Sequence, residues 1–193
     1  MKSICVFCGS NTGSDPVFSE AAIKLGQSLA ARKIRLVYGA GNVGLMGVIA
    51  DACLEAGGEV LGVIPGFLKA KEVCHTDLTE LVVTNTMHER KQIMADHSDG
   101  FIAMPGGFGT LDELCEILTW SQLGLHANPI GLLNVAGYFD HLIQMFDHMV
   151  SQRFLAQANR DLVLADVRPH DLLQKMTDFD PPEVEKWLDR SRT

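Results

Sequence analysis

Short apolar segments alternate along this chain with longer segments in which apolar residues recur every three or four positions. The first of the short segments, residues 4–8, is continuously apolar, as strands are in a sheet that is covered on both faces. The short segments predict seven strands, at 4–8, 34–38, 59–64, 80–84, 101–104, 129–133 and 161–165. The longer segments predict helices at 16–32, 44–56, 87–97, 111–123 and about 138–153, with two short helices after the last strand. This alternation predicts an α/β fold, a Rossmann-like doubly wound parallel sheet with helices on both faces.

Local signals support several of these boundaries. Asp15 is a predicted N-cap, and Pro16 occupies the first helical position. The pair Gly57-Gly58 is predicted to end the second helix. The polar segment 67–77 fits neither period, so we expect a loop near the site. Because no linker or repeat interrupts the pattern, residues 1–193 are predicted to form a single domain.

The net charge of −8 argues against a broad nucleic-acid or membrane surface. No apolar run approaches the ~20 residues that a membrane span needs. Residues 1–6 lead directly into a strand pattern, which is not typical of a signal peptide. We therefore expect a cytoplasmic protein with no nucleic-acid and no membrane partner.

The cysteines are scattered and odd in number: Cys5, Cys8, Cys53, Cys74 and Cys115. Cys5 and Cys8 have C-x-x-C spacing, but residues three apart on a strand point to opposite faces. No second C-x-x-C completes a zinc site, although Cys74-His75 could contribute in principle. We predict buried reduced thiols, no metal and no cofactor.

The segment Pro105–Glu113, P-G-G-F-G-T-L-D-E, lies between a predicted strand and a predicted helix. Its glycines let the backbone approach a ligand closely, and the free N–H groups of the helix start favour an anion. Glu113 places a carboxylate beside that anion, which indicates a nucleotide-binding site that also catalyses a reaction. The alternative is a capping box, in which Glu113 returns to the N–H of Thr110. The glycine run favours the nucleotide site, because a capping box needs no glycines before it.

Two further segments follow strands at the same sheet edge. Residues 39–47, G-A-G-N-V-G-L-M-G, contain G-x-G-x-x-G, but no acidic residue ends the next strand to bind a ribose diol. Close approach of a phosphate or ribose and a tight turn with helix–sheet packing are equally supported there. In Met87–Lys91, Arg90 could reach a phosphate, a ribose or a base, and its alternative is a solvated helix face. Neither a P-loop nor a G-x-S-x-G elbow is present.

Together, Pro105–Glu113, Met87–Lys91 and Gly44–Gly47 resemble the motifs of the LOG ("lonely guy") family, cytokinin riboside 5′-monophosphate phosphoribohydrolases that are often mislabelled lysine decarboxylases. The combined P-G-G-x-G-T-x-x-E and R-K pattern is highly specific to that family, and the resemblance covers nearly the whole chain. It implies a Rossmann-like fold and a homodimer with active sites near the subunit interface. It also implies hydrolysis of the N-glycosidic bond of AMP-type nucleoside 5′-monophosphates, including N6-prenyl-AMP.

By this resemblance, Arg90 and Glu113 are the catalytic pair. The glycine–threonine turn binds the phosphate, which assigns that role to Gly106, Gly107, Gly109 and Thr110. Further substrate-binding residues are predicted at Ser10, Gly44, Met87 and Lys91. The triplet 39–41 is Gly-Ala-Gly, where the family more commonly has Gly-Gly-Gly.

Cleavage of the N-glycosidic bond develops positive charge on the ribose. We expect Glu113 to stabilise that cation and to orient or deprotonate the attacking water, as carboxylates do in glycosidases. Arg90 is permanently charged, so we expect it to act electrostatically and by hydrogen bonding. A non-catalytic nucleotide-binding or sensor protein with the same site is the competing interpretation. A pyridoxal-phosphate decarboxylase is disfavoured, because no lysine lies in a convincing Schiff-base context.

Overall fold

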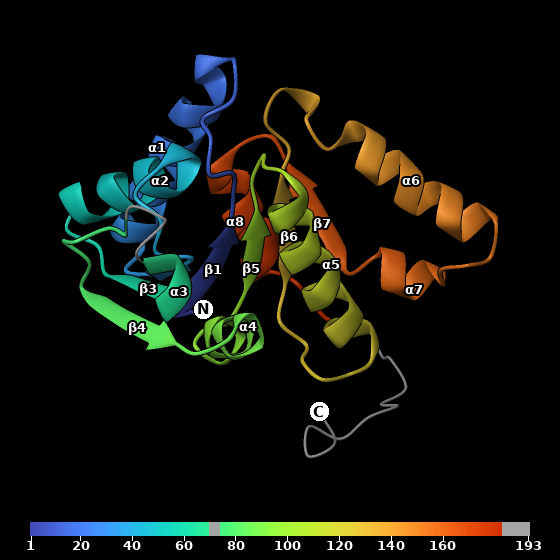
Figure 1. The fold of residues 1–193 in the computed structure, drawn as a ribbon. Helices are drawn as coiled ribbons and strands as arrows, with labels where there is room; N and C mark the ends of the chain where they lie inside the picture. The colour runs from blue at the N-terminus through green and yellow to red at the C-terminus, as the bar shows by residue number, and fades with distance from the viewer. Residues whose placement is uncertain (70–73, 183–193) are drawn as a thin grey trace.

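In the computed structural model, which describes residues 1–69 and 74–182, seven strands form one sheet in the order β4-β3-β2-β1-β5-β6-β7 (Figure 1). Every neighbouring pair of strands is parallel. The strands are β1 (Ser3–Phe7), β2 (Arg35–Tyr38), β3 (Val60–Pro65), β4 (Glu80–Thr84), β5 (Phe101–Ala103), β6 (Ile130–Leu133) and β7 (Val163–Asp166). The predicted doubly wound parallel sheet is therefore confirmed.

Helices cover both faces of this sheet. One face packs against α1 (Pro16–Ala31), α2 (Gly44–Glu55) and α8 (Pro169–Thr177), and the other against α4 (Met87–Asp96), α5 (Phe108–Gln122) and α6 (Asp140–Ser151). Shorter elements are α3 (Gly66–Lys69), α7 (Gln157–Arg160) and the 3-10 helix η1 (Val135–Gly137). Within β1, Ile4 and Val6 belong to the first core while Cys5 and Phe7 belong to the second. The period of two along each strand thus divides the apolar residues between two cores.

Helix boundaries follow local chemistry. Asp15 caps α1 by accepting a hydrogen bond from the Val17 N–H (2.9 Å), with Pro16 at the first helical position, as predicted. Gly57 takes φ +77° directly after α2, which is the conformation that a helix-ending glycine supplies. The predicted ends of the second helix and of the fourth strand are also close to those observed.

Four predicted elements differ from the observed ones or fall partly outside the described chain. The helix expected at 111 begins three residues earlier, at Phe108, and the last strand begins two residues later than predicted. The expected loop 67–77 contains α3, and Cys74 forms an isolated bridge with Gly41. Residues 70–73 of that loop lie outside the described residues. One of the two expected C-terminal helices is α8, and any helix after residue 182 also lies outside them.

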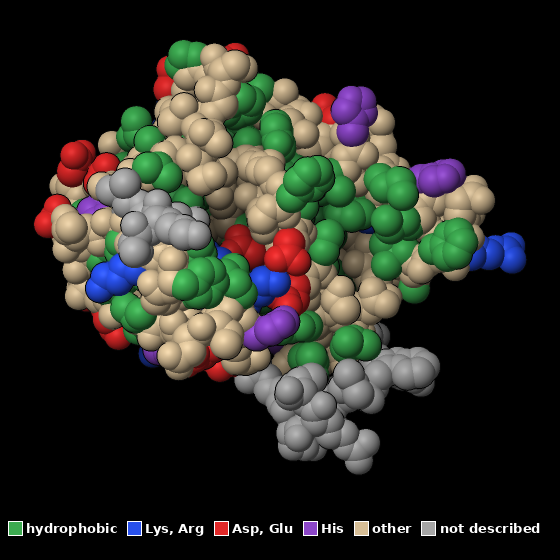
Figure 2. Space-filling model, viewed as in Figure 1, with side chains coloured by type: hydrophobic (Ala, Val, Ile, Leu, Met, Phe, Trp, Pro, Cys, Tyr) green, Lys and Arg blue, Asp and Glu red, His purple; other side chains and the backbone are tan. Residues whose placement is uncertain are grey.

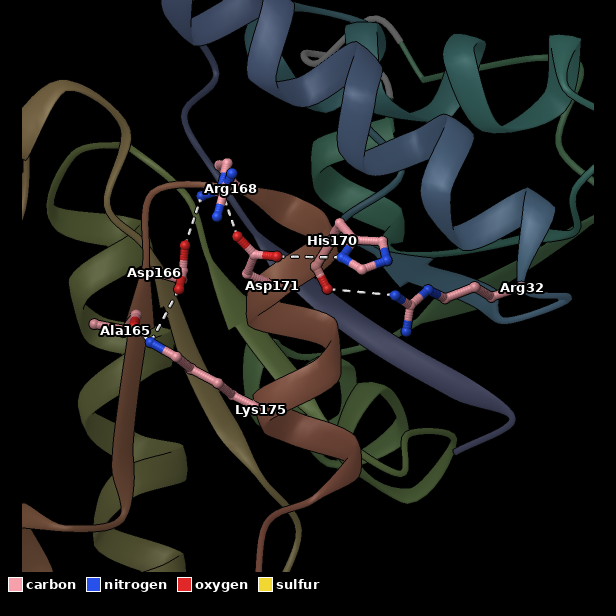
Figure 3. Close-up of polar contacts among 7 residues, drawn as sticks. All are labelled: Arg32, Ala165, Asp166, Arg168, His170, Asp171 and Lys175. Atoms are coloured by element: carbon pink, nitrogen blue, oxygen red, sulfur yellow. Dashed lines mark hydrogen bonds and ion pairs between the residues drawn. The ribbon is translucent and has the colours of Figure 1, made fainter.

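A polar network ties α8 to its neighbours (Figure 3). The ammonium of Lys175 lies 2.9 Å from Asp166 and donates to the Ala165 carbonyl (2.8 Å). The Arg168 N–H donates to Asp166 (3.0 Å). Burial alone acts to raise the pKa of Asp166, but the hydrogen bonds from Arg168 and Lys175 outweigh it and lower that pKa. Asp166 therefore anchors the first turn of α8 to the end of β7.

The cysteine prediction was correct for three of the five thiols. Cys5, Cys8 and Cys53 are buried, and Cys5 and Cys8 face opposite cores as expected. Cys74 is half-buried, and Cys115, on α5, is exposed. Within residues 1–69 and 74–182, no group of three or more His, Cys, Asp or Glu side chains could hold a metal ion. No helix in that part of the chain is both long and apolar enough to cross a membrane.

Candidate active site

The order of the strands reverses between β1 and β5, and the loops that leave the carboxyl ends of these strands meet there. The Gly9 N–H donates to the Pro105 carbonyl (3.0 Å), which joins the β1 loop to the β5 loop. The Leu45 N–H donates to the Gly9 carbonyl (3.0 Å), which joins the start of α2, directly after the β2 loop, to the β1 loop. Ligands of open α/β sheets bind at such a switch point. The candidate site is therefore built from three loops locked together by backbone hydrogen bonds.

Arg90 and Glu113 form an ion pair at this edge of the sheet. The Nη1 atom of Arg90 lies 2.9 Å from the Oε1 atom of Glu113, and each side chain is 12% exposed. The Nε atom of Arg90 also donates to the Val63 carbonyl (3.1 Å) at the end of β3. A solvated helix face is therefore the wrong interpretation of Arg90. Figure 2 shows acidic and basic side chains gathered in the middle of this face, between α4 and α5.

Burial raises the pKa of Glu113, while the adjacent Arg90 guanidinium acts in the opposite direction. The carboxyl group of Glu113 is thus partly removed from water, and the permanent positive charge of Arg90 lies at hydrogen-bond distance from it. Perturbed carboxyl groups of this kind are common where an enzyme uses a carboxylate in its chemistry.

Lys91 connects the two helices that carry this pair. Its ammonium lies 2.8 Å from Asp112 and 3.1 Å from Glu116, and its side chain is 14% exposed. Burial acts to lower the pKa of Lys91, but the hydrogen bonds that its ammonium donates to the two carboxylates outweigh this effect and raise that pKa. The structure therefore places Lys91 in the contact between α4 and α5, with two carboxylates on its ammonium.

The glycine turn leaves the N-terminal amides of α5 open. The helix has Gly107 as its N-cap without a side-chain hydrogen bond, and the first bond within the helix runs from the Leu111 N–H to the Gly107 carbonyl (3.2 Å). The amides of residues 107–110 therefore have no acceptor within the helix. A Cβ atom added at Gly107 or Gly109 would meet open space, whereas one at Gly106 would overlap the buried Thr110 hydroxyl.

The capping-box interpretation of Thr110 and Glu113 was wrong. Because α5 begins at Phe108, Thr110 is the third residue inside the helix and cannot be its cap. The carboxylate of Glu113 is paired with Arg90 on α4 instead. Half of a capping box does occur at the start of α4, where Thr86 is the N-cap and its hydroxyl accepts from the Glu89 N–H (3.1 Å).

The glycines of segment 39–47 make close packing contacts. A Cβ atom at Gly39 would overlap the guanidinium of Arg90, so the absence of a side chain there makes room for the ion pair. Gly44 has φ +61°, and a Cβ atom there would overlap the backbone of Ser10 and Asn11. This packing brings Gly44 against the exposed Ser10 beside the site, while Met87 begins α4 and is half-buried.

Sequence reasoning missed two side-chain contacts at this edge. The Tyr138 hydroxyl donates to the Gly106 carbonyl (2.6 Å) from the loop that follows β6. The ring of the buried His75 contacts Asp51 (2.8 Å), and the backbone N–H of His75 donates to the Ala40 carbonyl (3.0 Å), which ties this segment to the β2 loop. Tyr138 could have been found from its place after a strand at the same sheet edge. His75 lies in the segment without a clear period, and no sequence signal pairs it with Asp51.

A family model described as "Possible lysine decarboxylase" matches residues 46–176. A probable cytokinin riboside 5′-monophosphate phosphoribohydrolase of Oryza sativa subsp. japonica is 50% identical over 91% of this chain and 79% of its own. A cytokinin riboside 5′-monophosphate phosphoribohydrolase of Arabidopsis thaliana is 46% identical over 93% of this chain and 79% of its own. The chain belongs to the LOG family. Its motifs had predicted this membership correctly.

Solved structures with lower identity to this LOG family member share its fold. A molybdenum cofactor binding protein of Rippkaea orientalis has a TM-score of 0.67 at 24% identity and covers 92% of this chain and 97% of its own. A structural-genomics target solved by X-ray crystallography has a TM-score of 0.71 at 22% identity, with coverages of 93% and 100%. At such identities these similarities establish the Rossmann-like fold and do not bear on the chemistry of the site.

Proposed function

We propose that this chain hydrolyses the N-glycosidic bond of AMP-type nucleoside 5′-monophosphates, including N6-prenyl-AMP, to a free base and ribose 5-phosphate. The observation that carries this proposal is the buried Arg90–Glu113 pair beside the open N-terminus of α5. The curated relatives compared above, which are 46% and 50% identical to this chain, are named for this reaction on cytokinin riboside 5′-monophosphates.

The 5′-phosphate is held by the amides of residues 107–110. These N–H groups lack helix acceptors, and the dipole of α5 adds partial positive charge at the same end. The chain as a whole carries a net charge of −8, so local amides must provide the attraction that overall charge does not. Binding the remote phosphate also positions the ribose for reaction.

Glu113 acts on the sugar. Side chains on a helix tilt toward its N-terminus, which directs the carboxylate of Glu113 toward the end of α5 where the phosphate binds. As the bond between C1′ and the base breaks, its electron pair leaves with the base and positive charge develops on the ribose. The carboxylate stabilises that charge and accepts a proton from the water whose oxygen bonds to C1′. The proton then passes to the departing base, which completes the reaction.

Arg90 keeps Glu113 ionised until the reaction begins. Its guanidinium is always protonated, and its charge opposes the effect of burial on the carboxyl group. Hydrogen bonds to Val63 and Glu113 occupy its Nε and Nη1 atoms, so the geometry of the pair is fixed before substrate arrives. In this preorganised state the pair needs little rearrangement in the transition state.

Four further residues complete the proposed substrate site. Ser10 and Gly44 form its wall where the β1 and β2 loops touch, and Met87 supplies apolar surface at the start of α4. Lys91 is also proposed to help bind the substrate, and its ion pairs with Asp112 and Glu116 hold α4 and α5 together, so that Arg90 and Glu113 stay paired.

We propose that residues 1–193 act as a single domain.

We further propose a homodimer whose interface lies near the site. Two aromatic side chains have little cover, since Phe108 in the glycine turn beside the site is 94% exposed and Phe154, which follows the far end of α6, is 88% exposed. Met145 on α6 is half-exposed as well, and such apolar groups are often buried in an interface. Light scattering after size-exclusion chromatography should give about twice the 21.1 kDa mass of one chain, and a monomer would contradict the dimer. The cytoplasmic location stays a prediction of the sequence.

A decarboxylase activity, suggested by the description of the family model, is not supported by the lysine beside the site. Schiff-base chemistry requires a neutral amine, whereas two carboxylates raise the pKa of Lys91 and hold it protonated.

The decisive experiment for the proposed hydrolysis incubates the protein with AMP and, separately, with N6-prenyl-AMP. Chromatography should detect free base and ribose 5-phosphate in equal amounts. Tight binding of both nucleotides without any product would favour the sensor interpretation instead.

A further inference from the structure

Tyr138 contacts the glycine turn from a different loop. It follows η1 at the start of α6, and its hydroxyl donates to the carbonyl of Gly106 over 2.6 Å. Gly106 belongs to the β5 loop, so this bond links the loops that leave two neighbouring strands. Among the described residues, no other side chain donates a hydrogen bond to the glycine turn at 106–109.

The bond determines the orientation of one peptide unit of the turn. A peptide is planar and trans, so its carbonyl and its N–H point in opposite directions. Glycine has the widest choice of backbone angles, and two adjacent glycines leave the plane of the 106–107 peptide poorly defined. Because the Gly106 carbonyl points toward Tyr138, the Gly107 N–H must point away from it. That N–H is the first of the open amides at the start of α5.

The position of Tyr138 is itself well defined. Its ring packs edge-on against Phe18 on α1 (5.9 Å between centroids) and against Phe139 (5.1 Å). The preceding turn places Ala136 at φ +51°, in the left-handed region that non-glycine residues rarely adopt. The side chain of Asn134 closes this turn by accepting from the Phe139 N–H (2.7 Å). The hydroxyl is therefore held in place by packing before any ligand binds.

We propose that Tyr138 is a positioning residue for 5′-phosphate binding, because it fixes the Gly106–Gly107 peptide with the Gly107 N–H available to the phosphate. This inference rests on the proposed function, in which the amides of residues 107–110 bind the phosphate. Tyr138 contacts neither the reacting carbon nor the base in this account. Its loss should therefore weaken the binding of phosphate-bearing ligands and leave the bond-breaking step nearly intact.

The test is Tyr138→Phe, which removes the hydroxyl and keeps the ring packing. The KM for AMP should rise roughly 3- to 10-fold, the effect expected for one neutral hydrogen bond, with kcat changed less than about twofold. The inhibition constant of ribose 5-phosphate should rise by the same factor, and that of adenine should stay constant. An unchanged KM, or equal weakening of both inhibitors, would overturn the proposal.

The chain offers a matched control in its second tyrosine. Tyr38 is fully buried at the end of β2, and its hydroxyl has no hydrogen-bond partner in the described part of the chain. Tyr38→Phe should leave the KM for AMP and both inhibition constants unchanged. Failure of the proposed function is recognised separately, as absence of turnover in the unmodified protein. Calorimetric titration of ribose 5-phosphate into Tyr138→Phe and the unmodified protein then still tests Tyr138, because equal affinities would reject it.

Discussion

The guanidinium of Arg90 donates to the carboxylate of Glu113 over 2.9 Å, although the two residues lie on different helices and 23 positions apart. Arg90 lies near the start of α4, after the edge strand β4, and Glu113 lies on α5, after the interior strand β5. Parallel strands bring both helix starts to one edge, so the topology of the sheet creates the pair. The following predictions depend on this contact and on the elements that hold it.

Glu113→Gln should remove most of the turnover and little of the binding. Glutamine has nearly the same size and can still accept the Arg90 hydrogen bond, but it carries no charge to stabilise the ribose cation. We expect kcat for AMP to fall roughly 10²- to 10⁴-fold, with the affinity for AMP changed only slightly. Stopped assays of base release together with calorimetric titration of AMP measure both quantities. A variant with normal kcat would remove Glu113 from the mechanism.

Arg90→Ala should abolish turnover and also weaken the fold. The change leaves the buried Glu113 carboxylate without its partner, a loss that costs roughly 3–5 kcal/mol for a buried pair. Urea unfolding at pH 7 measures this cost. In the double variant Arg90→Ala, Glu113→Gln no charge is left unpaired, so part of the lost stability should return. If the single variant unfolds like the unmodified protein, the pair is weaker than its burial indicates.

The activity should be lost on acidification at a pH above the usual range of glutamate. The carboxylate form is the active one, and burial raises the pKa of Glu113 above its ordinary value of 4.5. Lowering the pH through this raised pKa protonates the carboxyl group, so kcat/KM should decline there along a single-proton limb. Profiles of kcat/KM for AMP between about pH 4 and 8 check this. A limb at or below the ordinary glutamate value would contradict it.

Gly39→Ala should lower activity by acting on Arg90. A methyl group at this position would overlap the guanidinium, and Arg90 would have to leave its bonds to Val63 and Glu113. We expect at least a roughly 10-fold lower kcat/KM for AMP, since a small misplacement of a catalytic group is costly. The control is Gly66→Ala, whose methyl would have ordinary contacts with Val83 and Thr84 at 3.7 and 3.8 Å. Equal effects of the two variants would disprove the steric argument.

Asp166→Asn should reduce stability at neutral pH and have little effect under acid conditions. The pKa of Asp166 is lowered in the folded chain, so its contribution is present above the unfolded pKa and is lost as the pH falls through the folded value. We expect the variant to lose about 1 kcal/mol or less at pH 7, because the contact with Lys175 is partly exposed. Urea unfolding of both proteins at pH 7 and at pH 3 measures this. A difference that is larger at pH 3 would have the wrong sign.

Much of the fold could be predicted from the sequence because the strands are mostly apolar and because glycine, proline and aspartate mark several helix ends. The same signals failed at α5. Thr110 resembles an N-cap in the sequence, but Gly107 is the N-cap and the helix already begins at Phe108. The order of the strands does not follow from the pattern of any one segment. That order determines which loops meet at the site.

The site could be predicted in its parts and not in its connections. Glu113 and the glycine turn were found because helix starts after strands have a recognisable pattern. The contacts of Lys91 with two carboxylates, of Gly39 with Arg90 and of Tyr138 with Gly106 join separate loops. The partners in these contacts depend on side-chain positions that tertiary packing determines. For Tyr138 the sequence indicates only its place after a strand at the same sheet edge, and not its bond to Gly106.

The most direct test of the account is a crystal structure of Glu113→Gln with AMP bound. We predict that phosphate oxygens will lie within hydrogen-bond distance of the amides of residues 107–110. The side chain at position 113 should face the C1′ atom of the ribose, with Arg90 beside it. A phosphate bound elsewhere, or a side chain at position 113 that is directed away from the sugar, would contradict the account.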